Sequence, residues 1–218
     1  VNIFLISCIS SILFGLEKPA SGKVYLEGTI FEPKSPADAI YRGVHMSPKD
    51  RANNAVVGDF DIEANLTLPF TKNFSTFGFT DRKRQYSVCS DMIDTIGIVC
   101  QSGKDAIETL SGGNQQKVIV GRWLLKPCKV LILDEPFQGV DIKARRDIGG
   151  HIRATSDNRA TLVFVSELDE AIEIADRIIV LHEKAIVGEH VNRNIDLSEL
   201  LSQVSGNSNP LKQAEVIE

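Results

Sequence analysis

Short apolar runs alternate with amphipathic stretches through the C-terminal half of the chain. The apolar runs have the length of buried strands, and the stretches between them have the 3.6-residue period of helices. In chain order these segments are Lys129–Leu133, Ile142–Ala154, Thr161–Val165, Leu168–Ala175 and Arg177–Leu181. Strands that alternate with helices build a mainly parallel sheet covered by helices. The sequence therefore predicts an α/β fold with ligands at the carboxyl ends of its strands.

The N-terminal half mixes strand and helix patterns. Strand patterns occur at Lys23–Ile30 and Gly43–Ser47, and between them a short helix is predicted at Ser35–Arg42, opened by a Ser-Pro pair. Further on, loops rich in Asn, Asp and Phe surround two more helices. These are predicted at Asp61–Leu66 and Arg82–Ile96. Together with a helix that follows Ser111, they indicate a helical subdomain over about residues 52–125.

The core face of the longest of these helices is indicated by apolar residues at helical spacing. They are Tyr86, Cys89, Met92, Ile93 and Ile96. We expect all five to face the interior.

The two ends of the chain differ in character. The first fifteen residues, VNIFLISCISSILFG, are apolar but lack the basic residues that open a signal peptide and are too short to span a bilayer. We predict a buried strand or helix there, with a signal peptide as the second alternative. Residues 206–218 are polar and broken by Pro210, so we predict a tail or linker. Residues 1–205 are then predicted to form one domain.

Composition limits the classes of partner. The chain has 218 residues, a formal charge of −5 and no basic run longer than Arg82–Arg84, so we expect no nucleic acid partner. Its four cysteines have no CxxC pairing and no histidine at a ligand spacing. They are Cys8, Cys89, Cys100 and Cys128. We expect small buried thiols in a reducing compartment, without zinc or disulfides.

Two adjacent acids end the apolar run of residues 130–133. Asp134 and Glu135 would stand at the carboxyl end of a buried strand, and Pro136 would stop that strand. An acidic surface turn is the simplest interpretation. The alternative is a site for a magnesium nucleotide, in which one carboxylate holds Mg²⁺ and the next orients the attacking water.

A glycine pair opens the helix that precedes this strand. Gly112 and Gly113 follow Ser111, which is a good N-cap residue. The first turn of such a helix leaves backbone N–H groups free and can bind a phosphate. Taken alone, the pattern is also that of an ordinary helix start.

The ordered pair LSGGNQQK at Leu110–Lys117 and VLILDEP at Val130–Pro136 resembles the ATP-binding subunits of ABC transporters. LSGGNQQK is similar in particular to the second nucleotide-binding domain of the monosaccharide importers of the ribose, galactose and xylose type. The resemblance covers nearly the whole chain and implies a P-loop NTPase-like ABC ATPase domain. It includes LFGLEKPASGKVYLEG at Leu13–Gly28, SPADAIYRGV at Ser35–Val44, IEANLTL at Ile62–Leu68, GVD at Gly139–Asp141 and SELDEAIEIADRIIVL at Ser166–Leu181.

The resemblance assigns a first group of residues to the nucleotide. In ABC proteins the segment equivalent to Leu110–Lys117 closes over the γ-phosphate of an ATP molecule that the facing domain holds. Carried over, Ser111, Gly112 and Gly113 would contact that phosphate, and Gln115 would belong to the same nucleotide-binding segment.

A second group follows from the same resemblance. Asp134 would serve Mg²⁺, and Glu135 would be the general base or would orient water. Asp141 would lie at the seam between the two domains. Ser166 stands where most ABC ATPases place a histidine that senses the γ-phosphate.

Besides Ser166 in place of that histidine, two features depart from the family pattern. Leu5-Ile6-Ser7 stand where a glycine-rich P-loop belongs, so we expect a chain truncated before the P-loop that binds β- and γ-phosphates weakly by itself. Lys49 falls within Ser47–Arg51, where these domains have Gln or Glu, and it reverses the charge expected near the metal.

The resemblance implies the ATP-binding fragment of a sugar importer on the cytoplasmic face of the plasma membrane. Its cofactors would be ATP and Mg²⁺, and its partners a second nucleotide-binding domain and membrane permease subunits. One alternative is a non-hydrolysing truncated remnant or regulatory module. Another is a soluble ABC-type ATPase of DNA repair or translation, which the acidic charge and the form of LSGGNQQK disfavour.

Four phenylalanines allow two interpretations. They lie in the region that contacts the membrane subunit in related transporters, so they could form a partner-binding patch or a local core. They are Phe70, Phe74, Phe77 and Phe79.

Overall fold

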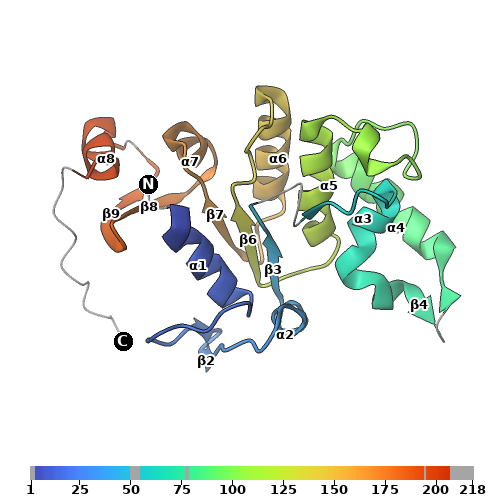
Figure 1. Cartoon of the computed structure of the whole chain (residues 1–218). Coiled ribbons are helices and arrows are strands. Elements are labelled where there is room, and N and C mark those ends of the chain that lie inside the picture. The colour runs from blue at the N-terminus through green and yellow to red at the C-terminus, as the bar shows by residue number, and fades with distance from the viewer. Residues whose placement is uncertain (1–2, 50–54, 77–78, 194, 207–218) are drawn as a thin grey trace.

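Three parallel strands form the centre of the molecule in a computed structural model that describes residues 3–49, 55–76, 79–193 and 195–206 (Figure 1). β3 (Val44–Ser47) and β7 (Ala160–Phe164) flank β6 (Val130–Asp134). The register pairs Ser47 with Leu133 and Asp134 with Phe164, so the three carboxyl ends share one edge. The predicted α/β class with a parallel sheet is confirmed.

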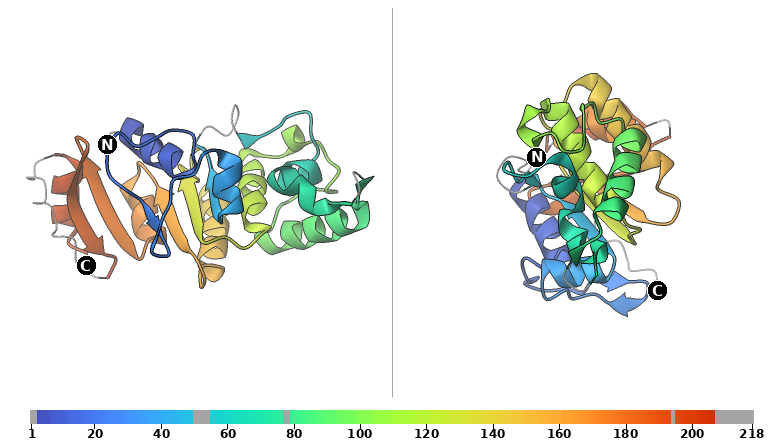
Figure 2. Two further views of the ribbon diagram at one scale, coloured as in Figure 1. Left: turned by 90° about the horizontal axis from the view of Figure 1, so that it is seen from below. Right: turned by 90° about the vertical axis from the view of Figure 1, so that its right-hand side faces the viewer.

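Helices cover both faces of this sheet. α1 (Ile3–Leu13) lies on one face and α6 (Ile142–Ala154) on the other, as Figure 2 shows. Residues 3–13 form a helix, one of the two structures predicted for the apolar N-terminal stretch, and Phe14, which follows α1, is buried in the main core. No helix within the described ranges is long and apolar enough to cross a membrane.

A second, smaller unit follows the sheet. α7 (Leu168–Ile174) leads from β7 to β8 (Arg177–His182), which pairs antiparallel with β9 (Ala185–Val191). α8 (Leu197–Val204) packs on that pair and buries Leu200 completely. The sequence interpretation did not identify β9 or α8.

Helices form the other end of the molecule, on the far side of β3 from β7 in Figure 1. They are α3 (Ile62–Thr67), the 3₁₀ helix η2 (Leu68–Phe74), α4 (Arg82–Ile96), the 3₁₀ turn η3 (Ile107–Thr109) and α5 (Gly112–Leu124). These α-helices begin at side-chain caps, since Asp61, Asp81 and Ser111 each accept a bond from a backbone N–H three residues on. The three predicted helices are confirmed.

The remaining elements are short. Residues 23–30 form a hairpin rather than one strand, because Glu27 and Gly28 take positive φ and turn the chain. The elements are β1 (Tyr25–Leu26), β2 (Thr29–Ile30), α2 (Pro36–Tyr41), β4 (Ser75–Thr76) and β5 (Phe79–Thr80).

Two expectations about burial need correction. On α4, Cys89 and Ile96 are buried as predicted and Met92 and Ile93 are partly buried against the core, but Tyr86 is 60% exposed. The cysteines are all free, but only Cys89 is buried; Cys8, Cys100 and Cys128 are half-buried.

The four predicted phenylalanines do not all follow one interpretation, the local core or the exposed patch. Phe70 and Phe74 are core residues, and Phe79 is 81% exposed. Phe77 lies outside the described residues, as do residues 207–218, which make up most of the predicted tail.

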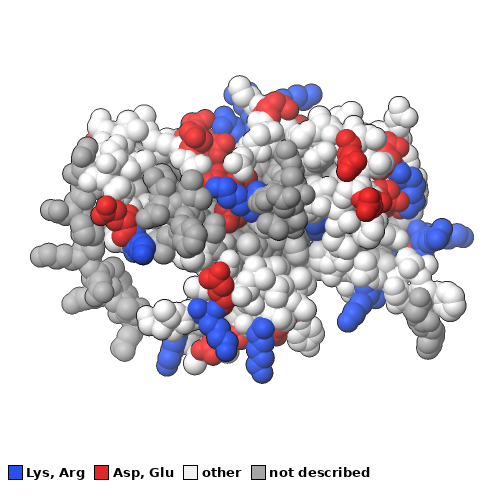
Figure 3. Space-filling view, viewed as in Figure 1, with Lys and Arg blue, Asp and Glu red and all other residues white. Residues whose placement is uncertain are grey.

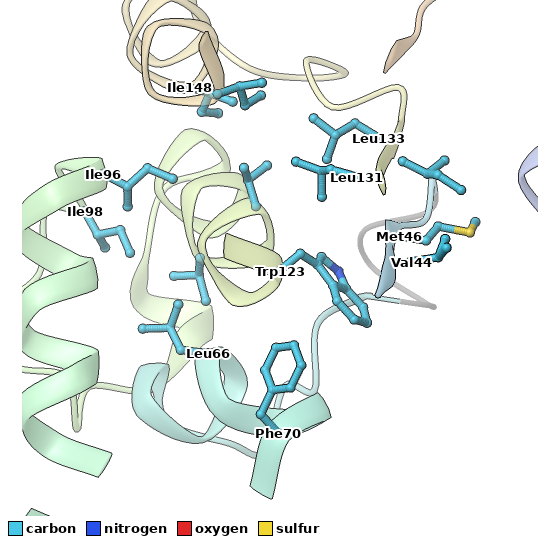
Figure 4. Close-up of a cluster of buried hydrophobic side chains, with 14 of the residues drawn as sticks. Val44, Met46, Leu66, Phe70, Ile96, Ile98, Trp123, Leu131, Leu133 and Ile148 are labelled. Carbon is cyan, nitrogen blue, oxygen red and sulfur yellow. The ribbon is translucent and has the colours of Figure 1, made fainter. Parts of the chain in front are cut away.

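The main core lies between the sheet and α5. The Trp123 ring is only 7% exposed, close to Phe70 and to the side chains of β3 and β6 (Figure 4). Phe14 meets the indole edge-on, with ring centroids 5.9 Å apart. Trp123 therefore anchors the core where α5 meets the sheet.

A cavity of about 520 Å³ separates β7 from β8. Its lining is mainly apolar and includes Ile9 of α1, Ile152 of α6 and the large apolar side chains Leu162 and Ile179. Leu162 is 38% exposed and Ile179 46% exposed. Within the described ranges β7 is an edge strand of its sheet and β8 pairs with β9 alone, so two strand edges border this cavity.

Candidate functional site

The acid pair at the end of β6 is buried. Asp134 is 4% exposed and Glu135 7% exposed, so the simplest interpretation, an acidic surface turn, was wrong. Glu135 has φ of 50°, in the left-handed region that a residue with a Cβ seldom adopts. Its N–H donates to the carbonyl oxygen of Phe164 over 2.8 Å. Pairing with the end of β7 therefore holds Glu135 in this unusual turn, as is common at functional sites.

Three polar side chains surround the acids. The Ser10 hydroxyl of α1 donates to Oδ2 of Asp134 at 3.3 Å. Nζ of Lys49 lies 4.0 Å from Oε1 of Glu135. Ser47 is fully buried one register position from Asp134, and its hydroxyl has no hydrogen-bond partner among the described residues. A buried hydroxyl without a partner is costly unless a ligand or water satisfies it.

A second buried carboxylate belongs to the same electrostatic environment. Burial raises the pKa of Glu170 on α7; Arg145 opposes that shift, and the negative charge of Glu135 adds to it. Nη1 of Arg145 lies 3.6 Å from Oε1 of Glu170. Figure 3 shows acidic and basic side chains gathered over α6, α7 and the neighbouring strand ends.

Sequence reasoning missed four of these side chains. They are Ser10, Ser47, Arg145 and Glu170. A serine that ends a buried strand is a signal that could have identified Ser47, whereas Ser10 is one of three serines on α1 and the sequence does not single it out. Arg145 and Glu170 carry no such signal, because charged residues on helices are usually solvated.

The glycine pair lies at the start of α5. Ser111 is exposed and caps this helix, and its hydroxyl accepts the N–H of Asn114 at 3.4 Å. Gly113 is buried where α5 meets the start of α6. A Cβ at this position would lie 2.9 Å from Cβ of Ala144 and 3.2 Å from Oδ2 of Asp141. Close helix packing therefore requires glycine here, whatever ligand the loop binds.

Asp141 lies beside this glycine and caps α6. Its Oδ1 accepts the N–H of Ala144 at 3.0 Å, and that hydrogen bond, with a smaller effect from the charge of Lys117, holds the pKa of Asp141 below its ordinary value. The N-termini of α5 and α6 thus lie side by side. Their first-turn N–H groups and helix dipoles favour an anion.

Gln115 and Ser166 complete the predicted set. The amide of Gln115 donates to the carbonyl oxygens of Leu110 at 3.2 Å and Ile107 at 3.4 Å, so it supports the loop before α5. Ser166 is exposed, two residues after β7 and close to the start of α7.

The predicted site residues form two groups. Asp134, Glu135 and Ser166 follow strands whose carboxyl ends share one edge. Ser111, Gly112, Gly113, Gln115 and Asp141 belong to the N-termini of α5 and α6. Their individual contacts with a nucleotide stay predictions.

The strand edge fits a magnesium ion that is shared with phosphate. Mg²⁺ is usually bound by one or two carboxylates together with substrate phosphates. Asp134 supplies a carboxylate, and the unpaired hydroxyl of Ser47 is a further oxygen donor at this edge. The described residues contain no group of three or more His, Cys, Asp or Glu that could hold a metal by themselves. The remaining ligands would have to come from phosphate and water.

Solved structures confirm the fold. The chain superposes on the ATP-binding cassette MJ0796, in a dimeric post-hydrolysis state bound to ADP and Pi, with a TM-score of 0.72 and 20% identity, covering 87% of this chain and 81% of that one. The cassette MJ1267 of an ABC transporter gives a TM-score of 0.71 at 20% identity, with 85% and 75% covered.

Sequence relatives are closer. A ribose import ATP-binding protein of Streptococcus agalactiae serotype III (strain NEM316) is 38% identical over 197 residues, which is 89% of this chain and 40% of that protein. One of Bacillus licheniformis is 34% identical over 195 residues, with the same shares. The chain thus spans about two fifths of the length of these relatives.

The family model described as ABC transporter matches residues 7–138, which include both LSGGNQQK and VLILDEP. This match covers more than half of the chain and includes β6, where the acid pair lies. The chain therefore belongs to the ABC transporter family, as an ATP-binding component related to ribose import ATP-binding proteins.

Proposed function

We propose that this chain is the ATP-binding part of a sugar importer and that it couples ATP binding and hydrolysis to carbohydrate uptake. Three relatives, from Streptococcus agalactiae, Bacillus licheniformis and Rubrobacter xylanophilus, are named ribose import ATP-binding proteins, and these names support the sugar class. The observation that carries the catalytic part is the buried pair of Asp134 and Glu135, with Glu135 held in a left-handed turn. Burial of two adjacent acids is costly, so a ligand that uses them is favoured.

The two groups of residues would have separate tasks. At the strand edge, Asp134 would hold Mg²⁺, which would neutralise charge on the transferred phosphate, and Glu135 would accept the proton of the attacking water or orient that water. Ser166 would hydrogen-bond the γ-phosphate. Ser10 would position the carboxylate of Asp134 through the hydroxyl bond of 3.3 Å.

The other group would act on a second nucleotide. The N-termini of α5 and α6, with Ser111, Gly112 and Gly113, would close over the phosphate of an ATP molecule held by a facing domain. Asp141 would lie at the seam, and Gln115 would support the loop. This arrangement requires a second nucleotide-binding domain, and we propose membrane permease subunits as the further partners, with the chain peripheral at the cytoplasmic face of the plasma membrane.

The domain division belongs to the same proposal. Residues 1–205 would form the ATP-binding domain, with a helical subdomain over about 52–125. Contacts of α3 with α4 and α5 support that subdomain, since these helices pack together beyond β3.

Reconstitution tests the proposal. The full chain is mixed with a partner domain that carries a P-loop, and ATP turnover is measured. We expect turnover in the mixture and its loss, by at least about a hundredfold, with Glu135→Gln. Glu183→Gln is the matched control, because Glu183 also has positive φ (46°) but is exposed on the turn between β8 and β9. Turnover by the chain alone would contradict the composite site.

One observation favours the second candidate, a non-hydrolysing regulatory module. Lys49 forms an ion pair with Glu135, so the carboxylate proposed as the general base is engaged by a cation instead of being free to bind water. A mixture that binds nucleotide but shows no turnover, with wild-type Glu135 present, would support this candidate instead.

A further inference from the structure

Lys49 lies beside the buried acid pair, where a positive charge offsets the cost of burying a carboxylate. β3 ends at Ser47, and its pairing with Leu133 brings the following residues to the level of Glu135. Two residues later, Nζ of Lys49 lies 4.0 Å from Oε1 of Glu135. The Lys49 side chain is 28% exposed and that of Glu135 only 8%, so this is a partly buried ion pair.

The charges around Glu135 show why this cation matters. Asp134 and Glu170 add two buried carboxylates to the same region. Arg145 of α6 is already shared among three acids of α7. Its guanidinium lies 3.0 Å from Asp169, 3.6 Å from Glu170 and 3.2 Å from Glu173. Among the described residues, Lys49 is the one basic group with an ion pair to Glu135.

We propose that Lys49 is a resident cation that competes with divalent metal at Asp134 and Glu135. This inference rests on the proposed nucleotide site. In the free chain the ammonium balances Glu135 and repels a second cation, so the site stays closed to free Mg²⁺. A metal that arrives with nucleotide brings phosphate oxygens, and these can draw Lys49 away from Glu135. The lysine thereby makes metal binding at this edge depend on phosphate.

The size of the repulsion can be estimated. An ammonium about 6 Å from a divalent ion disfavours its binding by about tenfold even at the dielectric constant of water, and by more in a partly buried site. A neutral side chain at this position removes the repulsion. A carboxylate at this position adds a ligand, because Mg²⁺ and Mn²⁺ prefer oxygen donors.

The test measures Mn²⁺ binding to the full chain without nucleotide, by electron paramagnetic resonance of the free ion. Relative to the wild type, we expect Lys49→Gln to bind Mn²⁺ about tenfold more tightly and Lys49→Glu more tightly still. Lys34→Gln is the control, because it removes the same charge from an exposed residue before α2. Asp134→Asn, added to Lys49→Gln, should abolish the gain and thereby locate it.

The outcomes separate this inference from the proposed function. Equal Mn²⁺ affinities for Lys49→Gln and Lys34→Gln would overturn the role of Lys49, as would a gain that survives Asp134→Asn. A gain at Lys49 together with no turnover in the reconstituted mixture would leave the cation competition standing and refute the ATPase role. Circular dichroism checks that each variant is folded before its Mn²⁺ affinity is compared, because removal of Lys49 leaves the buried Glu135 carboxylate without its cation.

Discussion

Gly113 and Gly150 allow one substitution to be tested in two environments. Both glycines lie in helices, Gly113 in the first turn of α5 and Gly150 near the end of α6. A Cβ at Gly113 would lie 2.9 Å from Cβ of Ala144, a distance that real Cβ atoms essentially never show, whereas a Cβ at Gly150 meets no atom within 4 Å. Replacement by alanine should therefore change stability in opposite directions.

The magnitude follows from two effects. Alanine in a helix is favoured over glycine by about 0.5–1 kcal/mol, and this gain applies to both sites. Inserting a methyl group into a filled contact costs about 1–3 kcal/mol, and this cost applies only to Gly113. We expect Gly150→Ala to stabilise the chain by about 0.5–1 kcal/mol. Gly113→Ala should be less stable than Gly150→Ala by about 1–3 kcal/mol.

Urea denaturation of both variants and the wild type measures this difference. The free energies of unfolding are compared at equal m values, so that a shift in midpoint reports stability. If Gly113→Ala were as stable as Gly150→Ala, the close approach of α5 to α6 would be wrong. Gly113 would then be required for its ligand alone.

Three further predictions follow from other buried contacts. Arg122→Met should lower the free energy of unfolding, measured by urea denaturation, by about 2–4 kcal/mol, because the guanidinium is buried and donates to three oxygens at 2.6–3.0 Å. Arg146 is exposed, so Arg146→Met should change that free energy by less than about 0.5 kcal/mol. Burial lowers the pKa of His45 below its ordinary value of 6.5. The contribution of neutral His45 to the free energy of unfolding is therefore complete above pH 6.5 and is lost as the pH falls through the pKa of the folded state. His45→Gln should make the free energy of unfolding depend less on pH between about 7 and 5. The double variant Leu162→Thr, Ile179→Thr should bind less of the dye ANS and should aggregate less by light scattering, because both side chains are exposed beside the cavity. Unchanged dye binding would show that ANS does not bind at this cavity.

Local patterns predicted most of the secondary structure. The helix over Arg82–Ile96 and that over Ile142–Ala154 have the predicted bounds, because caps at Asp81 and Asp141 start them and their apolar spacing is regular. The hairpin at residues 23–30 was not predicted, although Gly28 marks its turn, because the two strands are only two residues long and the segment reads as one β-rich run. β9 was missed because it follows a turn at Glu183 and Lys184 that takes positive φ without glycine.

The family and the acid pair could be predicted from the sequence, because both depend on residues that are neighbours along the chain. LSGGNQQK and VLILDEP are short ordered segments, and an apolar run that ends in Asp134 and Glu135 implies a strand end. The fold class follows from the same local information, since alternating strands and helices have few ways to pack.

Only the tertiary structure decided what surrounds these residues. The Ser10 hydroxyl meets Asp134 across 124 positions of sequence, and Lys49 reaches Glu135 from the loop that follows β3. Gly113 is confined by Ala144 of a different helix. Such contacts depend on how whole elements pack, and burial then determines which charges must be paired. The sequence pattern identifies the acidic residues of the site, and the packing of the elements determines which cation lies beside those carboxylates.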